Sequence, residues 1–460
     1  MSVSEATPGA PPQSRNGTGP HGESRLPELS LADSSRVIVA GLVPALVRGL
    51  FKPRVGASRR LTAIDADRRT VEVLGRIRRR HPGQGARLLG GRMVVLWGAD
   101  AIREVLEGSA TTYASDAGAK RKGMCHFQPD ALTISRGEEW RDRREFTESV
   151  LATSERVHPS GERFVAVVAD EVARLRIGGR IEWAHFERLF DRIALRVIFG
   201  DGARDDQELT GLLAKLMEQA NRVVGTGEGD SDDYHELHAR MEWHLREPEP
   251  GSLVARFAEA PHSDRTRVVH QIPHWVFATR DTLAANACRA LAAIVADPEV
   301  ERRVREELDG QDLSDPAAID GLRYLEGCLG EAMRLWPSTP LIARETTEDT
   351  TLAGERIEAG TQVMIVNAFN HRDPDSVADA DRLRPERWES GERDYRFNHL
   401  SNGTQDCPGG ALVYLLGKAA LAQLLDRWDL TLEEPRLEPG EPLPHMLDFY
   451  SVLFEARRRP

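Results

Sequence analysis

Cysteine is scarce in this chain of 460 residues, which contains four cysteines and no pair in a Cys-x-x-Cys spacing. Cys125, Cys288, Cys328 and Cys407 lie far apart along the chain. Neither a disulfide framework nor a zinc knuckle is therefore expected. Each cysteine has to be explained as a single thiol.

An excess of positive charge is also lacking, since the formal net charge is −12. This balance argues against a general nucleic-acid-binding protein, and no nucleic-acid partner is expected. Arginines nevertheless cluster at residues 76–80, 141–144 and 457–459. Such clusters are usually solvated faces, and docking of an acidic partner is the alternative.

The chain has no long hydrophobic run. Its first residues lack the charged-then-apolar pattern of a secretion signal. Residues 37–51 are apolar, but this stretch is too short to span a bilayer and is interrupted by Pro44 and Arg48. An ordinary core or surface helix is the simpler interpretation, and attachment to a membrane interface is the alternative. We predict a cytoplasmic protein without a transmembrane anchor.

The patterning indicates a mainly α protein with a minor β portion. Residues 1–30 are rich in Pro, Gly and Ser and are expected to be disordered. No repeat or composition break divides residues 36–460, so we predict one domain. The expected helices are 61–80, 100–107, most of 138–245, 273–297, 299–308 and 322–335. The expected strands are 86–89 and 92–97, which form a hairpin, and 362–366.

The glycine-rich loop at residues 400–410 carries one cysteine and leads into an apolar segment that favours helix. Gly403 and Gly409 allow positive φ, and Pro408 fixes the chain just after Cys407. A cysteine at a helix start is suited to exist as a thiolate and to bind a metal. A buried structural cysteine is the simpler interpretation.

Two charged or polar groups lie within apolar helices. Glu331 and Arg334 are three residues apart and share a helix face, where Arg387 is expected to join them. Asp281 and Thr282 lie in the helix 273–297 and form a candidate proton-delivery pair. The alternative for Thr282 is a hydrogen bond back to a helix carbonyl.

Three further side chains carry donors for an anionic group. Trp140 and Arg144 are four residues apart on one helix face, and Arg344 follows the turn at residues 337–340. His270 and His274 flank Pro273, where we expect them to cap the helix, with a substrate-pocket role as the alternative.

In this order, the motifs around Trp140, Asp281, Glu331, Arg387 and Cys407 resemble the cytochrome P450 superfamily of haem-thiolate monooxygenases. The resemblance covers nearly all of residues 36–460 and implies the cytochrome P450 fold with haem b (iron protoporphyrin IX) as cofactor. We expect a soluble protein of the bacterial type.

The resemblance also implies roles for the residues named above. Cys407 is expected to be the proximal ligand of the haem iron, in a haem-binding loop that includes Leu400, Gly403 and Gly409. Glu331, Arg334 and Arg387 form a structural network. Trp140, Arg144 and Arg344 pair with the haem propionates. Asp281 and Thr282 deliver protons to bound dioxygen.

The sequence departs from the family pattern at three positions. Leu400 stands where an aromatic residue is usual, Gln405 where a basic residue is usual, and Thr279 where a glycine is usual. We expect Arg344 and Arg144 to compensate for Gln405, with His126 or His399 assisting.

The function implied is insertion of one oxygen atom from dioxygen into an apolar or amphipathic organic substrate, in secondary or natural-product metabolism. Ferredoxin and ferredoxin reductase are the expected electron donors, with Arg141 and Arg143 as docking residues on a monomeric protein. The alternatives are peroxide-driven chemistry and a haem protein that binds a ligand without turnover. Residues 113–132, residues 221–224 and Phe277 are expected to line the substrate pocket.

Overall fold

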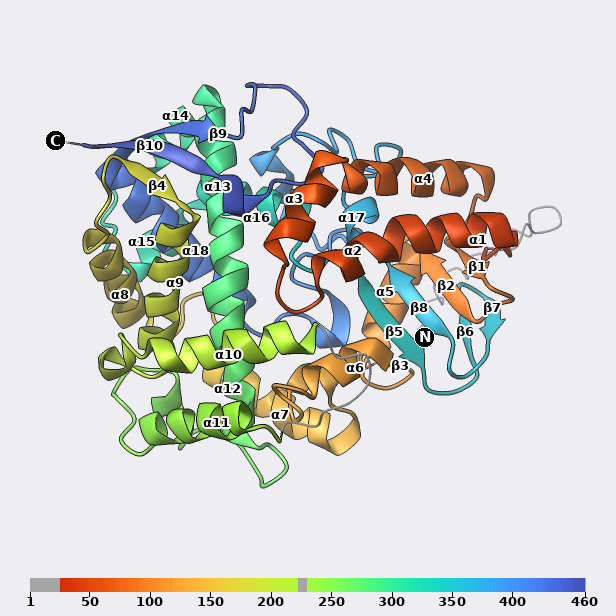
Figure 1. Ribbon diagram of the computed structural model, residues 1–460, viewed down its shortest axis with the longest axis horizontal. Coiled ribbons are helices and arrows are strands. Elements are labelled where there is room, and N and C mark those ends of the chain that lie inside the picture. The colour runs from red at the N-terminus through yellow and green to blue at the C-terminus, as the bar shows by residue number, and fades with distance from the viewer. Residues whose placement is uncertain (1–24, 117, 222–229, 460) are drawn as a thin grey trace, which may run out of the picture.

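The computed structural model describes residues 25–116, 118–221 and 230–459 (Figure 1). Helices dominate and the strands form small sheets, as the sequence predicts, within a single domain. Residue 221 is described, whereas the rest of the predicted pocket segment 221–224 lies outside the described residues. The α-helices are α1 (Leu31–Val37), α2 (Val43–Arg48), α3 (Val55–Ala63), α4 (Ala66–Arg80), α5 (Ala99–Glu107), α6 (Gly118–Met124), α7 (Gly137–Leu151), α8 (Gly161–Ala173), α9 (Trp183–Ile198), α10 (Gln207–Ala220), α11 (Asp232–Leu245), α12 (Ile272–Phe277), α13 (Ala284–Ala296), α14 (Pro298–Leu308), α15 (Pro316–Gly321), α16 (Arg323–Leu335), α17 (Asn367–Asn370) and α18 (Gly410–Arg427).

The largest sheet has five strands in the order β1-β2-β8-β5-β3. Its hairpin β1–β2 pairs Gly85 with Leu96 and confirms the hairpin predicted from the sequence. A three-stranded sheet has the order β4-β10-β9, and β6 pairs with β7. The strands are β1 (Gly85–Leu88), β2 (Met93–Leu96), β3 (Tyr113–Ala114), β4 (Arg180–Glu182), β5 (Ile342–Thr346), β6 (Thr350–Leu352), β7 (Glu355–Ile357), β8 (Gln362–Ile365), β9 (Trp428–Glu434) and β10 (Leu453–Arg458).

The segment predicted to be disordered differs from the structure at its end. Residues 25–30 pack along β1, where the Leu29 amide donates to the Arg87 carbonyl and the Arg87 amide donates to the Pro27 carbonyl. Leu26 and Leu29 are buried. These two leucines anchor residues 25–30 to the fold. The average composition of residues 1–30 hides this short ordered segment. Residues 1–24 lie outside the described residues.

The helix predicted at 61–80 is two helices. Asp65 adopts a left-handed conformation with φ of 51°, which ends the hydrogen-bonded run of α3 before α4 begins at Ala66. The helices predicted at 299–308 and 322–335 are confirmed as α14 and α16 within one residue at their starts.

The long helix predicted at 273–297 is the central rod of Figure 1, formed by α12, a π-helical segment (Ala278–Leu283) and α13. Pro273 lies in its first turn, where a missing N–H is tolerated. The helix ends at Asp297, whose carboxylate accepts hydrogen bonds from the first amides of α14. The π-helical segment widens the helix locally, and it includes Asp281 and Thr282.

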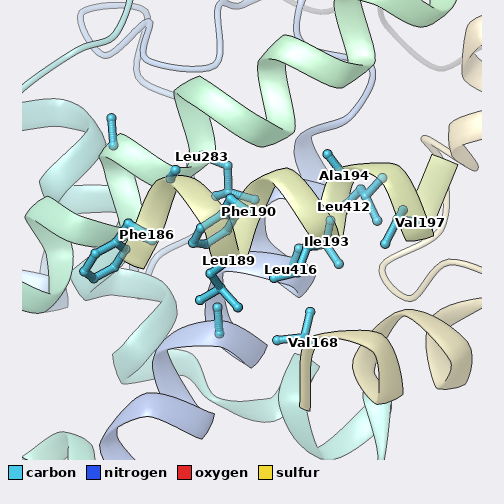
Figure 2. Packing of buried hydrophobic residues seen from close by; sticks show 14 of the residues in the cluster. Val168, Phe186, Leu189, Phe190, Ile193, Ala194, Val197, Leu283, Leu412 and Leu416 are labelled. Atoms are coloured by element: carbon cyan, nitrogen blue, oxygen red, sulfur yellow. The ribbon is translucent and has the colours of Figure 1, made fainter. Parts of the chain in front are cut away.

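Three helices meet around this rod. Figure 2 shows the apolar side chains of α9, including Phe186, Phe190 and Ile193, between Leu283 of the π-helical segment and the α18 side chains Leu412 and Leu416. A Cβ at Gly417 of α18 would lie 2.6 Å from the Leu329 side chain and 3.2 Å from that of Leu283. The absence of a side chain at Gly417 therefore lets α18 approach both α16 and the central rod.

Candidate functional site

The loop before α18 holds Cys407 through backbone hydrogen bonds. The Cys407 amide donates to the Leu400 carbonyl at 2.8 Å, and the Gly410 amide donates to the Cys407 carbonyl at 3.2 Å. Burial raises the pKa of the Cys407 thiol, and a hydrogen bond from the Gly409 backbone opposes this rise. The residue nevertheless keeps some exposed surface. A bound metal cation would turn this poorly ionising thiol into a thiolate.

Gly403 fixes the loop against α5. Its φ is 72°, and a Cβ there would overlap the Leu106 backbone. The next residue, Thr404, donates its hydroxyl proton to the Ser109 carbonyl at 2.8 Å. A glycine is thus required for close backbone approach, as the sequence indicates.

Glu331, Arg334 and Arg387 come together in one buried network. The Arg334 guanidinium donates to both Glu331 carboxylate oxygens, at 2.7 and 2.8 Å, and Arg387 donates to Glu331 at 3.1 Å. Glu331 and Arg334 are 0% exposed. The Trp388 indole and the Arg384 amide also donate to Glu331, so the buried carboxylate is fully satisfied.

A chain of hydrogen bonds connects this network to the cysteine loop. Burial lowers the pKa of His371 well below its usual range, so the ring is neutral. The Asn398 amide donates to His371 Nε2 at 2.8 Å, which leaves Nδ1 as the donor to the Arg334 carbonyl at 3.0 Å. Asn402 then donates to the Asn398 side-chain oxygen at 2.9 Å, directly before Gly403.

Sequence reasoning missed His371, Asn398 and Asn402. The two asparagines lie nine and five residues before Cys407, and that proximity was the available signal. His371 gave none, because its partners become neighbours only after folding.

Arg144 makes hydrogen bonds to acidic residues of the chain itself. Its guanidinium donates to the Asp406 carbonyl and carboxylate, each at 2.7 Å, and to Glu148 at 2.6 Å. These contacts use three of the five N–H donors of the guanidinium, so the pairing with a propionate stays a prediction. Arg144 holds the residue that precedes Cys407. Trp140 on the same helix is partly buried, and its indole N–H has no acceptor within the described part of the chain.

Arg344 is buried, and Lys120 is a partly buried cation close enough to interact with it electrostatically. Burial lowers the pKa of Arg344 to about 10, and burial together with the nearby Arg344 lowers the pKa of Lys120 to about 7. Arg344 donates to Ser109 and to the Ala343 carbonyl, and Lys120 donates to both oxygens of Thr133. Among the described residues neither cation forms an ion pair. This pair is suited to two carboxylates supplied from outside the chain.

The histidines proposed to compensate for Gln405 are engaged elsewhere. His126 lies 2.9 Å from the Gln219 side-chain oxygen, and the His399 ring lies against Trp388 and His371. Both amide atoms of Gln405 are buried without a hydrogen-bond partner among the described residues. Lys120, which the sequence motifs did not single out, supplies the missing charge.

The central rod leaves one face incompletely covered. His274, Phe277, Ala278, Asp281 and Thr282 are partly exposed at successive turns, whereas Trp275, Val276, Arg280 and Leu283 are buried. His274 is not a helix cap, because α12 begins at Ile272 and its cap position is Gln271, whose side chain makes no capping hydrogen bond. His270 is not one either, since it pairs with Asp130 at 3.1 Å.

Asp281 and Thr282 lie on this open face. Burial raises the pKa of Asp281, and Arg280 opposes the rise. The Arg280 guanidinium pairs closely with Asp191, at 2.8 Å. Its distance to the Asp281 carboxylate is longer, 3.7 Å. The Thr282 hydroxyl has no hydrogen-bond acceptor within the described part of the chain. The pair is thus an acid able to take up protons beside a free hydroxyl.

These features fit haem b. The Cys407 sulfur, on a partly exposed residue, would hold the haem iron, and Arg344 with Lys120 would supply charges for two propionates. The open face of the central rod belongs to the helix against which α18 packs. The roles expected for Cys407 and Arg344 stay predictions, and Lys120 is a further candidate that the sequence did not indicate.

Lys120 predicts a dependence of stability on pH in the haem-free chain. The pKa of Lys120 is about 7 in the folded chain and near 10.5 in the unfolded chain. Between pH 7 and pH 10.5, the unfolded chain therefore binds more protons than the folded chain does. The free energy of unfolding should therefore rise from pH 7 to pH 9, by up to about 2 kcal/mol. Denaturant titrations of the haem-free chain measure this rise. Lys120→Met and haem loading should each remove it, and an equal rise in Lys120→Met would contradict the assignment.

Comparisons with known proteins agree with this site. Residues 232–448 match the family model described as Cytochrome P450. A probable cytochrome P450 4d20 from Drosophila melanogaster is 31% identical over 207 residues, 43% of this chain and 39% of that protein.

Two further relatives come from a mammal and a plant. Human cytochrome P450 4V2 is 32% identical over 179 residues, and tabersonine 6,7-epoxidase isoform 1 from Catharanthus roseus is 31% identical over 179 residues. Each match covers 37% of this chain and 34% of the relative. The chain thus spans well under half the length of these relatives. The family-model match at residues 232–448 includes the Glu331 network and the Cys407 loop. Over residues 232–448, the chain is thus similar to proteins of the cytochrome P450 family.

Proposed function

We propose that the protein is a haem-thiolate monooxygenase that inserts one oxygen atom from dioxygen into an organic substrate. The observation that carries this proposal is the Asp281–Thr282 pair on the open face of the π-helical segment. A ligand-binding haem protein has no need for an acid and an unbonded hydroxyl at that place.

When bound to a cysteine thiolate, haem supplies dioxygen binding and the electron density that favours cleavage of the O–O bond. The chain's own residues do the rest. Gly409 and the Leu400 carbonyl hold Cys407 in place, and Arg144 holds Asp406 beside it. Arg344 and Lys120 would pair with the propionates. Asp281, whose pKa is raised by burial, takes up protons, and the Thr282 hydroxyl passes them on.

The acid–alcohol pair also favours dioxygen over peroxide as the oxidant, because peroxide already carries the protons that such a pair delivers. A substrate with an apolar body fits the partly exposed Phe277, and His274 one turn earlier adds a polar group to the same face. The class proposed is therefore an apolar or amphipathic molecule. Natural-product metabolism remains a prediction.

The expected electron donors are a ferredoxin and its reductase. Of the two arginines expected to dock them, Arg143 is not suited to this role. Its side chain is 5% exposed and donates to Asp130, Ser135 and the Arg265 carbonyl. Arg141, at 67% exposure, forms a surface ion pair with Glu138 and is the remaining candidate for docking. The bacterial type gains no support from relatives that come from animals and a plant, and the cytoplasmic location stays a prediction.

Labelled dioxygen tests the proposed function. The haem-loaded chain, a ferredoxin, its reductase and reduced nicotinamide are incubated under ¹⁸O₂ with compounds that shift the haem spectrum on binding. We expect a product that carries one ¹⁸O atom and depends on the electron donors. A product formed only with added peroxide would favour peroxide-driven chemistry. Binding of every compound without donor-dependent turnover would favour a haem protein that only binds a ligand.

A further inference from the structure

The N-terminal helices carry most of the large apolar side chains that the described residues leave exposed. Leu31 is 75% exposed and Val39 is 61% exposed. Among the described residues, the exposed large apolar side chains outside residues 31–64 are Leu89 and Trp243. The members within residues 31–64 are Leu31, Val39, Val43, Leu46, Val47, Leu50, Val55 and Ile64. A concentration of this kind marks an interaction surface rather than the usual scatter.

The spacing places these side chains along one helix face. Leu31, Val39, Val43 and Leu46 follow one another at intervals of eight, four and three residues through α1, a π-helical turn (Ile38–Leu42) and α2, and Leu50 lies just beyond the end of α2. Asp33, Ser34, Val37 and Ala45 on the other side of the same run are buried. In Figure 1 α1 and α2 form a continuous rod across the molecule, beside α4. The rod therefore presents an apolar stripe outward and is anchored by its opposite side.

The same segment is basic, although the whole chain is acidic. Residues 31–64 contain six basic residues and a single acidic one, Asp33, whereas the full chain has a formal net charge of −12. The basic residues are Arg36, Arg48, Lys52, Arg54, Arg59 and Arg60. An apolar stripe bordered by positive charge is the pattern of a helix that lies in a membrane interface.

An arginine groove adjoins the stripe between α1 and α4. Arg36, Arg76 and Arg80 line it together with Val73 and Ile77, and its volume is about 320 Å³. Asp33 pairs with Arg36 at 2.8 Å and with Arg80 at 3.2 Å. Arg76 donates to the Glu72 carbonyl and has no ion pair among the described residues. One carboxylate thus balances three guanidinium groups, which leaves net positive charge for an anion.

We propose that the apolar stripe and the arginine groove together dock this protein onto the surface of a bilayer that contains anionic phospholipids. The groove takes a headgroup phosphate, which guanidinium groups bind through paired hydrogen bonds. The stripe enters the interface beside it, with the helix axis along the membrane plane. A protein partner would use the apolar stripe alone, whereas the three arginines next to it specify an anionic headgroup. No helix of the described chain is long and apolar enough to cross the bilayer, and peripheral docking requires none.

Vesicle flotation with the haem-loaded full chain tests this proposal. We expect the protein to float with phosphatidylcholine vesicles that contain phosphatidylserine, and to float less at high salt or with phosphatidylcholine alone. Arg76→Glu should weaken binding to the anionic vesicles at least about tenfold, because it removes one positive charge and adds a negative one. Val39→Gln combined with Val43→Gln should weaken it by a similar factor.

Two control variants match these changes at a distance. Arg457→Glu on β10 and Trp243→Gln on α11 change an exposed charge and an exposed apolar residue far from the groove, and both should bind as wild type does (Figure 1). Thermal unfolding and the haem spectrum verify that each variant is folded. Wild-type protein that stays off anionic vesicles overturns the proposal, as does equal loss of binding in the controls. If the Arg76 and valine variants bind vesicles as wild type does, the proposal is also wrong. If the valine pair then loses self-association, the stripe is instead an interface with a second copy of the chain.

Discussion

Replacing Thr282 with alanine should divert reducing equivalents from product to hydrogen peroxide. The Thr282 hydroxyl is partly exposed on the open face of the central rod, and the neighbouring Asp281 has a raised pKa. A positioned proton donor contributes about 10²- to 10⁴-fold to rate, so product formed per nicotinamide oxidised should fall at least about tenfold. Parallel assays of nicotinamide consumption, peroxide and product measure this ratio.

Two variants separate proton delivery from packing. Thr282→Ser keeps the hydroxyl and should retain most of the coupling. Thr279→Ala lies in the same π-helical segment without the hydroxyl role and should leave coupling near the wild-type value. Asp281→Asn removes the acid and should slow oxygenation. Coupling in Thr282→Ala equal to that in wild type would refute the relay.

Replacing Arg334 with alanine should destabilise the fold severely. The Arg334 guanidinium donates five hydrogen bonds, to both Glu331 oxygens and to the carbonyls of His371, Ala380 and Arg382. It is 0% exposed, so its removal leaves the Glu331 carboxylate buried with too little compensation. Breaking a buried ion pair in this way costs about 3–5 kcal/mol. Denaturant unfolding measures the loss.

A surface ion pair on the same helix provides the control. Arg323 pairs with Glu326 on α16 with its side chain 55% exposed, and Arg323→Ala should cost less than about 1 kcal/mol. Because the His371, Asn398 and Asn402 chain joins Arg334 to the cysteine loop, Asn402→Ala should loosen haem retention while it destabilises the fold less than Arg334→Ala does. Equal denaturant midpoints for wild type and Arg334→Ala would show that the network is dispensable.

The elements that the sequence predicted well are those with a local signal. The periodicity around Pro273, the Gly90–Gly91 turn of the hairpin and the cysteine loop each depend on residues that lie close together in the chain. The break at Asp65 was missed because a left-handed residue between two helical patterns leaves both patterns intact. The π-helical segment at Ala278–Leu283 likewise has no composition that distinguishes it from α-helix.

The contacts of the site that the sequence did not indicate involve groups that lie far apart in the chain. Arg144 was assigned to a propionate by its spacing from Trp140, but its carboxylate partner Asp406 lies 262 residues away. Lys120 was overlooked because only folding brings it near Arg344 and removes it from water. Arg143, expected at the surface, is buried and donates hydrogen bonds to Asp130 and Ser135, which only folding brings close to it.

The reduced, carbon monoxide-bound spectrum of the haem-loaded chain tests the assignment of Cys407 most directly. If Cys407 is the thiolate ligand, the wild-type complex shows the strongly red-shifted Soret band of a haem thiolate. Cys407→Ser should then lose that band, whereas Cys125→Ser, a change at another partly exposed cysteine, should keep it. A wild-type complex without the shifted band, or a Cys407→Ser complex that retains it, would contradict the account.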